Sequence, residues 1–192
     1  MFAGIPYIAI TQIDFNSPIM KFKSLLLCLL ITFSISCEAT HKPHYDALSG
    51  PSHPDTVFPI PVGFINDFDN ILSDEQEATL LHLVKQHEAE TTNQIAIVTL
   101  TSIQGYEGLE SYSLDLANNW GIGQEDKDNG ILIALYMKDR RIWIQNGNGV
   151  MNKLTDDKTL QIINKIIVPE FKKDDYFSGF EKGIKEIIRE LK

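Results

Sequence analysis

The sequence feature that most constrains the fold is an almost wholly apolar run from Ile131 to Tyr136. A strand in which apolar residues do not alternate with polar ones is typical of a sheet that is buried on both faces. A second near-continuous apolar run extends from Gln94 to Thr101. Because helical patterns flank both runs, the sequence predicts an α/β fold with helices on both faces of the sheet.

The surrounding segments predict the remaining elements. Ser73 and Gln76 have the spacing of a capping box, which predicts a helix from there toward Thr91. The other expected elements are a helix from Leu109 to Trp120, a β-hairpin of Ile131–Tyr136 and Arg140–Asn146 that turns at Lys138-Asp139, a helix from Thr155-Asp156 that is stopped by Pro169, and a last helix after Tyr176. A short extended piece precedes Asp67. This order predicts a three-layer α/β/α sandwich with a central mixed sheet of about four strands, including the β-hairpin.

The N-terminal part has the pattern of a targeting leader. We interpret residues 1–19 as a misplaced start, because the basic start Met20-Lys21-Phe22-Lys23 would otherwise lie inside the chain. The apolar run that follows is too short for a transmembrane helix. Residues 20–37 resemble a bacterial lipoprotein signal peptide, in which Cys37 is lipidated and becomes the mature N-terminus; an ordinary signal peptide cut near Cys37 or Ala39 is the alternative. The mature protein is therefore expected to be extracytoplasmic, in the bacterial cell envelope, with an N-terminal lipid as its membrane anchor.

A proline-rich tether is expected over residues 38–62, followed by one folded domain over residues 63–192. The tether contains three histidines, His41, His44 and His53. They could bind a transition metal, but their irregular spacing favours solvated linker residues. His82 and His87 do not have a four-residue spacing, so both are predicted to be helix-surface residues rather than a pair of metal ligands.

Charge and cysteine content restrict the class of partner. The chain has 17 Lys and Arg against 26 Asp and Glu, a formal net charge of −9. This balance argues against nucleic acid or anionic lipid as a surface partner and in favour of a cation. Of the two cysteines, Cys28 would leave with the signal peptide, so no intramolecular disulfide is expected in the mature chain.

The acidic loop in front of the apolar run that begins at Ile131 is the best functional clue in the sequence. Asp126, Asp128 and Asn129, with Asp67 brought in by the fold, would supply only oxygen ligands, which suits Ca²⁺ or Mg²⁺. If the strands that flank each helix run parallel, however, Asp67 would lie far from Asp128, and Asp69 is an alternative ligand.

A tight turn would explain the same residues without a metal. In Asp128-Asn129-Gly130 the side chains could simply bond backbone amides. Two further segments have equally plain explanations: Arg140-Arg141 could grip a phosphate or could be the exposed start of a hairpin, and Gly147-Asn148-Gly149 offers only weak evidence of an anion-binding turn.

Several short motifs together resemble the TPM domain family. They occur in the order Asn66-Asp67, Gln94 to Thr99, Trp120-Gly121-Ile122-Gly123, Asp128-Asn129-Gly130, Asp139-Arg140-Arg141, Gly147 and Gly149, Leu154-Thr155-Asp156 and Asp175-Tyr176. The resemblance covers about Gly63 to the C-terminus. It implies an α/β/α sandwich, an extracytoplasmic position with membrane attachment, a bound divalent cation and, for some members, acid phosphatase activity. Met151 stands where many relatives have an acidic residue.

Two functions of different classes remain. One is a lipid-anchored, cation-binding scaffold or accessory module that contacts an envelope protein; the other is a metal-assisted acid phosphatase that acts on phosphomonoesters. A phosphatase needs a nucleophile or a metal-activated water. The expected domain has no cysteine nucleophile and no evident phosphate clamp, so the sequence favours the scaffold, with weak or absent phosphatase activity.

Overall fold

The computed structural model of the protein describes residues 58–192. The predictions for residues 1–57, which concern the misplaced start, the signal peptide, lipidated Cys37 and most of the tether, lie outside the described residues. Phe58 packs edge-on against Tyr112, with ring centroids 5.4 Å apart. The last five residues of the expected tether, 58–62, are therefore described together with the domain. Within this part of the chain, no helix has both the length and the hydropathy that a membrane crossing requires.

The centre of the fold is a mixed four-stranded sheet in the order β1-β2-β3-β4. Its strands are β1 (Ile65–Asp67), β2 (Gln94–Leu100), β3 (Gly130–Tyr136) and β4 (Arg141–Asn146). The first three strands are parallel, and β4 returns antiparallel to β3 as the expected hairpin. The mixed sheet is thus confirmed. The three-residue strand β1 corresponds to the short extended piece expected at Asp67.

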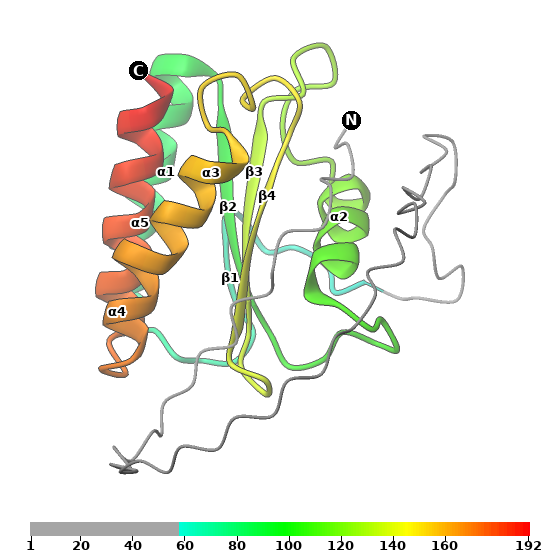
Figure 1. The fold of residues 1–192 in the computed structure, drawn as a ribbon, viewed down its shortest axis with the longest axis vertical. Helices are drawn as coiled ribbons and strands as arrows, with labels where there is room; N and C mark the ends of the chain where they lie inside the picture. The colour runs from blue at the N-terminus through cyan, green and yellow to red at the C-terminus, as the bar shows by residue number, and fades with distance from the viewer. Residues whose placement is uncertain (1–57) are drawn as a thin grey trace, which may run out of the picture.

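Helices cover the two faces of the sheet unequally (Figure 1). One face packs against α1 (Asp74–Thr91), α3 (Asp156–Ile162), the π-helical turn η1 (Ile163–Ile167), α4 (Val168–Phe171) and α5 (Tyr176–Leu191), whereas α2 (Leu109–Trp120) alone covers the other. Alternate β2 residues enter the two cores: Ile95 and Ile97 enter the larger one, and Ala96 and Val98 the one under α2. Both faces are covered, which explains the continuous apolar runs and confirms the three layers.

The capping box at the start of α1 forms as predicted. The Ser73 backbone N–H donates to Gln76 Oε1 (2.9 Å), and the Gln76 N–H donates to Ser73 Oγ (3.4 Å). Near the other end of the helix, His87 is only 2% exposed, so the predicted surface position of this histidine is wrong. Burial lowers the pKa of His87, which favours its neutral form.

Pro169 does not stop the helix that begins at Asp156, contrary to the prediction. The helix passes through η1 and continues as α4 to Phe171. A proline ring normally collides with the carbonyl four residues earlier, here that of Lys165. The chain widens by one residue just before Pro169, where the Val168 N–H donates to Ile163 O in a π-type bond. This wider turn explains how the proline is accommodated.

Candidate functional site

The polar residues singled out by sequence lie at two opposite ends of the sheet. The loop between α2 and β3 lies at the end where β2 and β3 begin, whereas the carboxyl ends of β1, β2 and β3 lie at the other end (Figure 1). In open α/β sheets, ligands usually bind at the carboxyl ends of the strands. Both ends therefore need to be considered.

Asn129 fastens the loop to the turn between α1 and β2. The Gln124 N–H donates to Asn129 Oδ1 (2.8 Å), and Asn129 Nδ2 donates to Thr92 O (2.9 Å). The side chain is almost fully buried, with 4% of Asn129 exposed. These bonds are those of the tight-turn alternative, so Asn129 has a structural role whether or not a cation is present.

The Gly147–Gly149 turn packs backbone to backbone against the same loop. The Gly147 N–H donates to Gly130 O (2.8 Å) and the Gly149 N–H to Asp128 O (3.0 Å). A Cβ atom at Gly147 would collide with Asp128 O, and one at Gly149 with Lys127 O. The two glycines are therefore needed for close backbone approach, and their amides serve the fold rather than an anion.

Asp126 and Asp128 remain as the carboxylates that the loop could offer to a cation. Asp126 is exposed and Asp128 is half-buried, with a backbone φ of 49°. Among residues 58–192, no group of three or more His, Cys, Asp or Glu is placed to hold a metal ion. Two carboxylates fit a hydrated Ca²⁺ or Mg²⁺, since both ions accept water among their oxygen ligands. They do not form a closed metal site.

Asp67 lies at the opposite end of the sheet from this loop. It pairs with Thr99 at the end of β2, whereas Gly130 pairs with Gln94 at the start. These positions are about 17 Å apart along the strand, from a rise of about 3.3 Å per residue. Asp67 Oδ1 accepts a hydrogen bond from Thr99 Oγ1 (2.6 Å), and Oδ2 accepts one from the Leu72 N–H (2.7 Å). The structure therefore does not bring Asp67 into one site with Asp126, Asp128 and Asn129.

Asp69 stays beside Asp67 and does not replace it as a ligand of the loop. Its backbone N–H donates to Thr99 Oγ1 (2.9 Å). Burial, and after it the neighbouring Asp67 carboxylate, raises the pKa of Asp69. The two carboxylates thus form a small acidic group at the carboxyl ends of β1 and β2.

The two arginines of the hairpin do not form a clamp. Arg140 is exposed in the turn with a φ of 51°. Arg141 packs under α2, with 13% of its side chain exposed, and its Nη2 lies 3.7 Å from Glu110 Oε2. The ion pair with Glu110 was not anticipated, because its two members are far apart in the sequence and no local motif links them. At 3.7 Å the two groups attract one another without a hydrogen bond, and Arg141 Nε, Arg141 Nη2 and Glu110 Oε2 are buried without a hydrogen-bond partner among the described residues.

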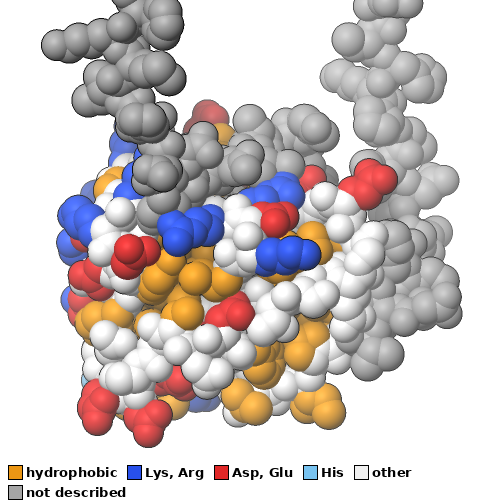
Figure 2. All heavy atoms as spheres, turned by 90° about the horizontal axis from the view of Figure 1, so that it is seen from below, with side chains coloured by type: hydrophobic (Ala, Val, Ile, Leu, Met, Phe, Trp, Pro, Cys, Tyr) orange, Lys and Arg blue, Asp and Glu red, His pale blue; other side chains and the backbone are white. Residues whose placement is uncertain are grey.

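Viewed from below, the carboxyl end of the strands is a mixed surface. Where the described residues form it, apolar side chains lie between Lys or Arg and Asp or Glu side chains (Figure 2). A surface of both charge signs gives no continuous basic patch for phosphate groups. The described residues visible in this view therefore do not present the basic patch that a phosphate-rich ligand requires.

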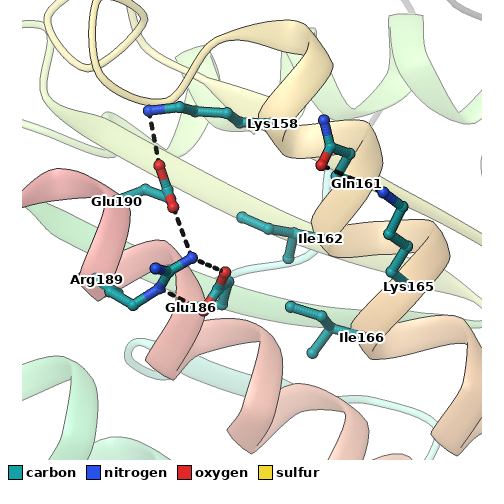
Figure 3. Close-up of a pocket in the computed structure, with 8 residues that line it drawn as sticks. All are labelled: Lys158, Gln161, Ile162, Lys165, Ile166, Glu186, Arg189 and Glu190. Carbon is teal, nitrogen blue, oxygen red and sulfur yellow. Dashed lines mark hydrogen bonds and ion pairs between the residues drawn. The ribbon is translucent and has the colours of Figure 1, made fainter.

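A shallow groove of about 130 Å³ between α3 and α5 also carries charged side chains (Figure 3). Most of these charges are paired with one another: Lys158 Nζ lies 2.7 Å from Glu190 Oε2, and Arg189 Nη2 lies 2.9 Å from Glu190 Oε1. Lys165 Nζ instead donates to the neutral Gln161 Oε1 (3.4 Å). Ile162 and Ile166 line the same groove. The groove is a helix junction stabilised mainly by ion pairs, and nothing in its lining pairs a nucleophile with a base.

Solved structures share this architecture. The N-terminal domain of a protein from P. gingivalis, solved by NMR, is 30% identical; the match covers 67% of this chain and 81% of that one, with a TM-score of 0.61. The BA42 protein from the psychrophilic bacterium Bizionia argentinensis is 19% identical, with 65% and 83% covered and a TM-score of 0.56. The N-terminal domain of the cg2496 protein from Corynebacterium glutamicum is 17% identical, with 71% and 84% covered and a TM-score of 0.54. The last two are evidence for the fold alone.

The search of curated proteins found no match. The family model of the TPM domain matches residues 65–190, nearly the whole of the described domain. This match confirms the resemblance to the TPM domain family that the short sequence motifs indicated. The chain belongs to the TPM domain family.

Proposed function

We propose that this protein is a membrane-anchored TPM-domain protein of the bacterial cell envelope that binds Ca²⁺ or Mg²⁺ and acts as a scaffold or accessory module for an envelope protein. One observation supports the scaffold over the phosphatase: the groups that phosphoryl transfer needs together are far apart. Asp128 precedes the first residue of β3, whereas Arg141 pairs with its last residue, Tyr136. Six residues of strand separate these ends by about 20 Å.

The proposed cation would be held by the Asp126 and Asp128 carboxylates, with water as the remaining ligands. Ca²⁺ takes 6–8 oxygen ligands, and the Ca²⁺ sites of extracellular modules have dissociation constants of about 10⁻⁴–10⁻³ M. A cation of this affinity suits a stabilising role in a compartment that is rich in divalent ions. It would offset the negative charge of Asp126 and Asp128 on a loop whose main-chain bonds already determine its conformation.

Thermal unfolding with added CaCl₂ or MgCl₂, against a chelator control, tests the cation. A ligand that binds only the folded state stabilises it by about 2.7 kcal/mol at a hundredfold excess over its dissociation constant. We expect Asp128→Ala to remove most of this gain and Asp139→Ala, an exposed carboxylate at the opposite end, to keep it. Equal stabilisation of the wild type and Asp128→Ala would reject the loop as the site.

The alternative is a metal-assisted acid phosphatase, in which a cation on Asp126 and Asp128 would activate a water molecule. Its support is the same pair of exposed and half-buried carboxylates. Transferring phosphoryl groups also require cationic stabilisation of the developing charge, and Arg141 lies beside Glu110 at the end of β3 opposite the loop. Turnover of p-nitrophenyl phosphate is therefore expected near background and unaffected by Asp128→Ala. Robust, chelator-sensitive hydrolysis that this substitution abolishes would establish the phosphatase instead.

A further inference from the structure

His87 takes a core position on α1, where the other buried residues are apolar. Leu80, Val84 and His87 are the buried residues of this helix, and they have the spacing of a single helical face. Leu80 and Val84 belong to the larger core of the domain. His87 is 2% exposed, whereas His82 on the same helix is exposed. A histidine at such a position is tolerated while it is neutral, because a buried charge is costly unless it is paired.

Hydrogen bonds around Thr91 determine which nitrogen of the neutral His87 ring carries the proton. The single hydroxyl hydrogen of Thr91 goes to the His87 carbonyl, because this contact is the shortest (Oγ1 to O, 2.7 Å). The hydroxyl oxygen is then an acceptor for the Asn93 N–H (3.2 Å) and for His87 Nε2 (3.3 Å). Asn93 Nδ2, at 3.5 Å, is farther from the same ring nitrogen. The neutral ring therefore carries its proton on Nε2 and donates it to Thr91.

The second ring nitrogen has no partner. Nδ1 of His87 is buried and makes no hydrogen bond among the described residues. In the neutral ring this nitrogen offers only a lone pair. A second proton would turn it into a buried N–H donor without an acceptor, on a ring that would also carry a positive charge. The cost of leaving a buried polar group unpaired is greater when the group is charged. The protonated ring therefore does not fit this position.

The charges that face the ring do not compensate for this cost. Burial has the largest effect and lowers the pKa of His87. Glu90, on α1 itself, raises this pKa, whereas Lys192, which follows α5, lowers it. From the loop before β3, Lys127 bonds to the turn that follows α1 and is another positive charge. The neighbouring strand β2 contains no charged residue. Glu90, an exposed side chain, is thus the one negative charge that favours protonation of the ring.

The turn beside His87 also holds the loop before β3. Asn129, in that loop, donates through Nδ2 to Thr92 O (2.9 Å) and to Asn93 Oδ1 (3.3 Å). The backbone N–H of Asn93 is in turn bonded to the Thr91 hydroxyl, which accepts from the His87 ring. A continuous set of hydrogen bonds therefore joins the ring to the loop. A ring that left its position would remove one support of the turn that fixes Asn129.

We propose that His87 is an acid-sensitive switch: when the ring takes up a proton from solvent it leaves the core, opens the turn between α1 and β2 and releases the loop that carries Asp126 and Asp128. Histidine is suited to this role because it changes charge near neutral pH. The neutral ring closes the turn through Thr91. In acid, the two carboxylates would no longer extend from a fixed backbone. The switch goes beyond the function proposed above, since it needs neither a cation nor a membrane anchor.

Urea unfolding of the full chain as a function of pH, in the presence of a chelator, tests the switch. An unfolded histidine takes up a proton at about pH 6.5, whereas burial lowers the pKa of His87 in the folded state. Below about pH 6.5 the unfolded state therefore binds more protons than the folded one. The stability that the neutral ring supplies is fully present above this pH and is lost as the pH falls. The unfolding equilibrium constant should rise by up to about tenfold for each unit of acidification.

Two variants isolate the contribution of His87. His87→Gln keeps an N–H donor for Thr91 but cannot take up a proton, so it should remove this part of the pH dependence. His82→Gln is the matched control, because it removes a histidine from an exposed position of the same helix and should keep the dependence. The comparison uses the change with pH and not the absolute stability. It therefore remains valid if His87→Gln is less stable at every pH.

Measurements on the wild type make the test independent of any variant. In the ¹⁵N-labelled full chain, NMR should show an unprotonated Nδ1 on His87 at neutral pH and a ring that titrates below the pH of an unfolded histidine. As the ring titrates, the Gln124 amide, which donates to Asn129 Oδ1 (2.8 Å), should exchange its hydrogen faster. The amide of Leu132, a fully buried residue of β3, is the internal reference and should not follow it.

Three results would overturn the proposal. The first is a His87 ring that titrates as an unfolded histidine does. The second is the same pH dependence of unfolding in the wild type and in His87→Gln. The third is titration of His87 without faster exchange at Gln124 relative to Leu132, which would limit the ring to a role in stability. All three are measured with a chelator, whereas the proposed cation is tested by added CaCl₂ or MgCl₂, so the two failures are distinguishable.

Discussion

At the scale of single residues, two glycines at the loop end of the sheet are important because they have no side chain. Gly147 and Gly149 bring one turn so close to the Asp128 loop that each amide reaches a carbonyl of the opposite backbone. Neither glycine has the positive φ that makes glycine irreplaceable for conformational reasons. Both positions require glycine because a side chain there would collide with the opposite backbone.

Gly149→Ala should destabilise the domain, because the new Cβ would collide with Lys127 O. Overpacking of a close contact costs about 1–3 kcal/mol, and urea unfolding would measure it. Gly63→Ala is the matched control, since a Cβ there meets no atom within 4 Å. If both variants unfold at the same urea concentration, close backbone approach is not the reason for Gly149.

At the scale of elements, the loop before β3 is a connector as much as a candidate ligand site. Asn129 joins it to the α1–β2 turn, where Thr92 ends α1 in a left-handed conformation with a φ of 68°. The Gln124 carbonyl accepts from the N–H groups of both Lys127 and Asp128. Main-chain bonds therefore determine the loop conformation. They also fix the backbone positions from which the Asp126 and Asp128 side chains extend.

Asn129→Ala should destabilise the domain even without divalent cations, because it leaves the Gln124 N–H and the Thr92 carbonyl without this side-chain partner. Each buried polar group that loses its partner costs about 1–3 kcal/mol. Asp126→Ala, at an exposed position of the same loop, should change stability by less than about 0.5 kcal/mol under these conditions. Unfolding in the presence of a chelator would compare the two. A small effect of Asn129→Ala that appears only with calcium would make Asn129 a ligand and not a structural residue.

At the scale of the whole molecule, the two ends of the sheet have different chemistry. The loop end carries Asp126 and Asp128, and the other end carries the Asp67–Asp69 group and the Glu110–Arg141 pair. A hollow lined by Val62, Leu81 and Trp120 lies at the β1 side of β2, separate from both of these groups of charges.

The proposed anchor is tested on the whole protein in cells. If Cys37 is lipidated, the mature protein should partition with membranes, since several acyl chains bind far more firmly than one. Cys37→Ala should release the protein or leave it unprocessed, and fractionation with intact-mass analysis would show which. An unmodified mature N-terminus downstream of Cys37 would contradict lipidation.

Local patterns in the sequence determined the elements of this fold. The apolar runs predicted β2 and β3 because a strand covered on both faces must be apolar at every position. The Ser73–Gln76 spacing predicted the start of α1 because the capping bonds join residues of a single turn. Both predictions depend only on neighbours in the chain, which is why they are confirmed.

The tertiary structure alone decided which residues meet. Asp67 and Asp128 are separated by the length of the sheet because β1, β2 and β3 run parallel, a pairing that no local pattern specifies. Arg141 meets Glu110 only because α2 crosses the face of β4. Asn66 joins the chain before β1 to β2, because its side chain bonds Val62, Gly63 and Ile97. Strand order, register and long-range hydrogen bonds join residues that are distant in the sequence, so the sites they create cannot be predicted from periodicity.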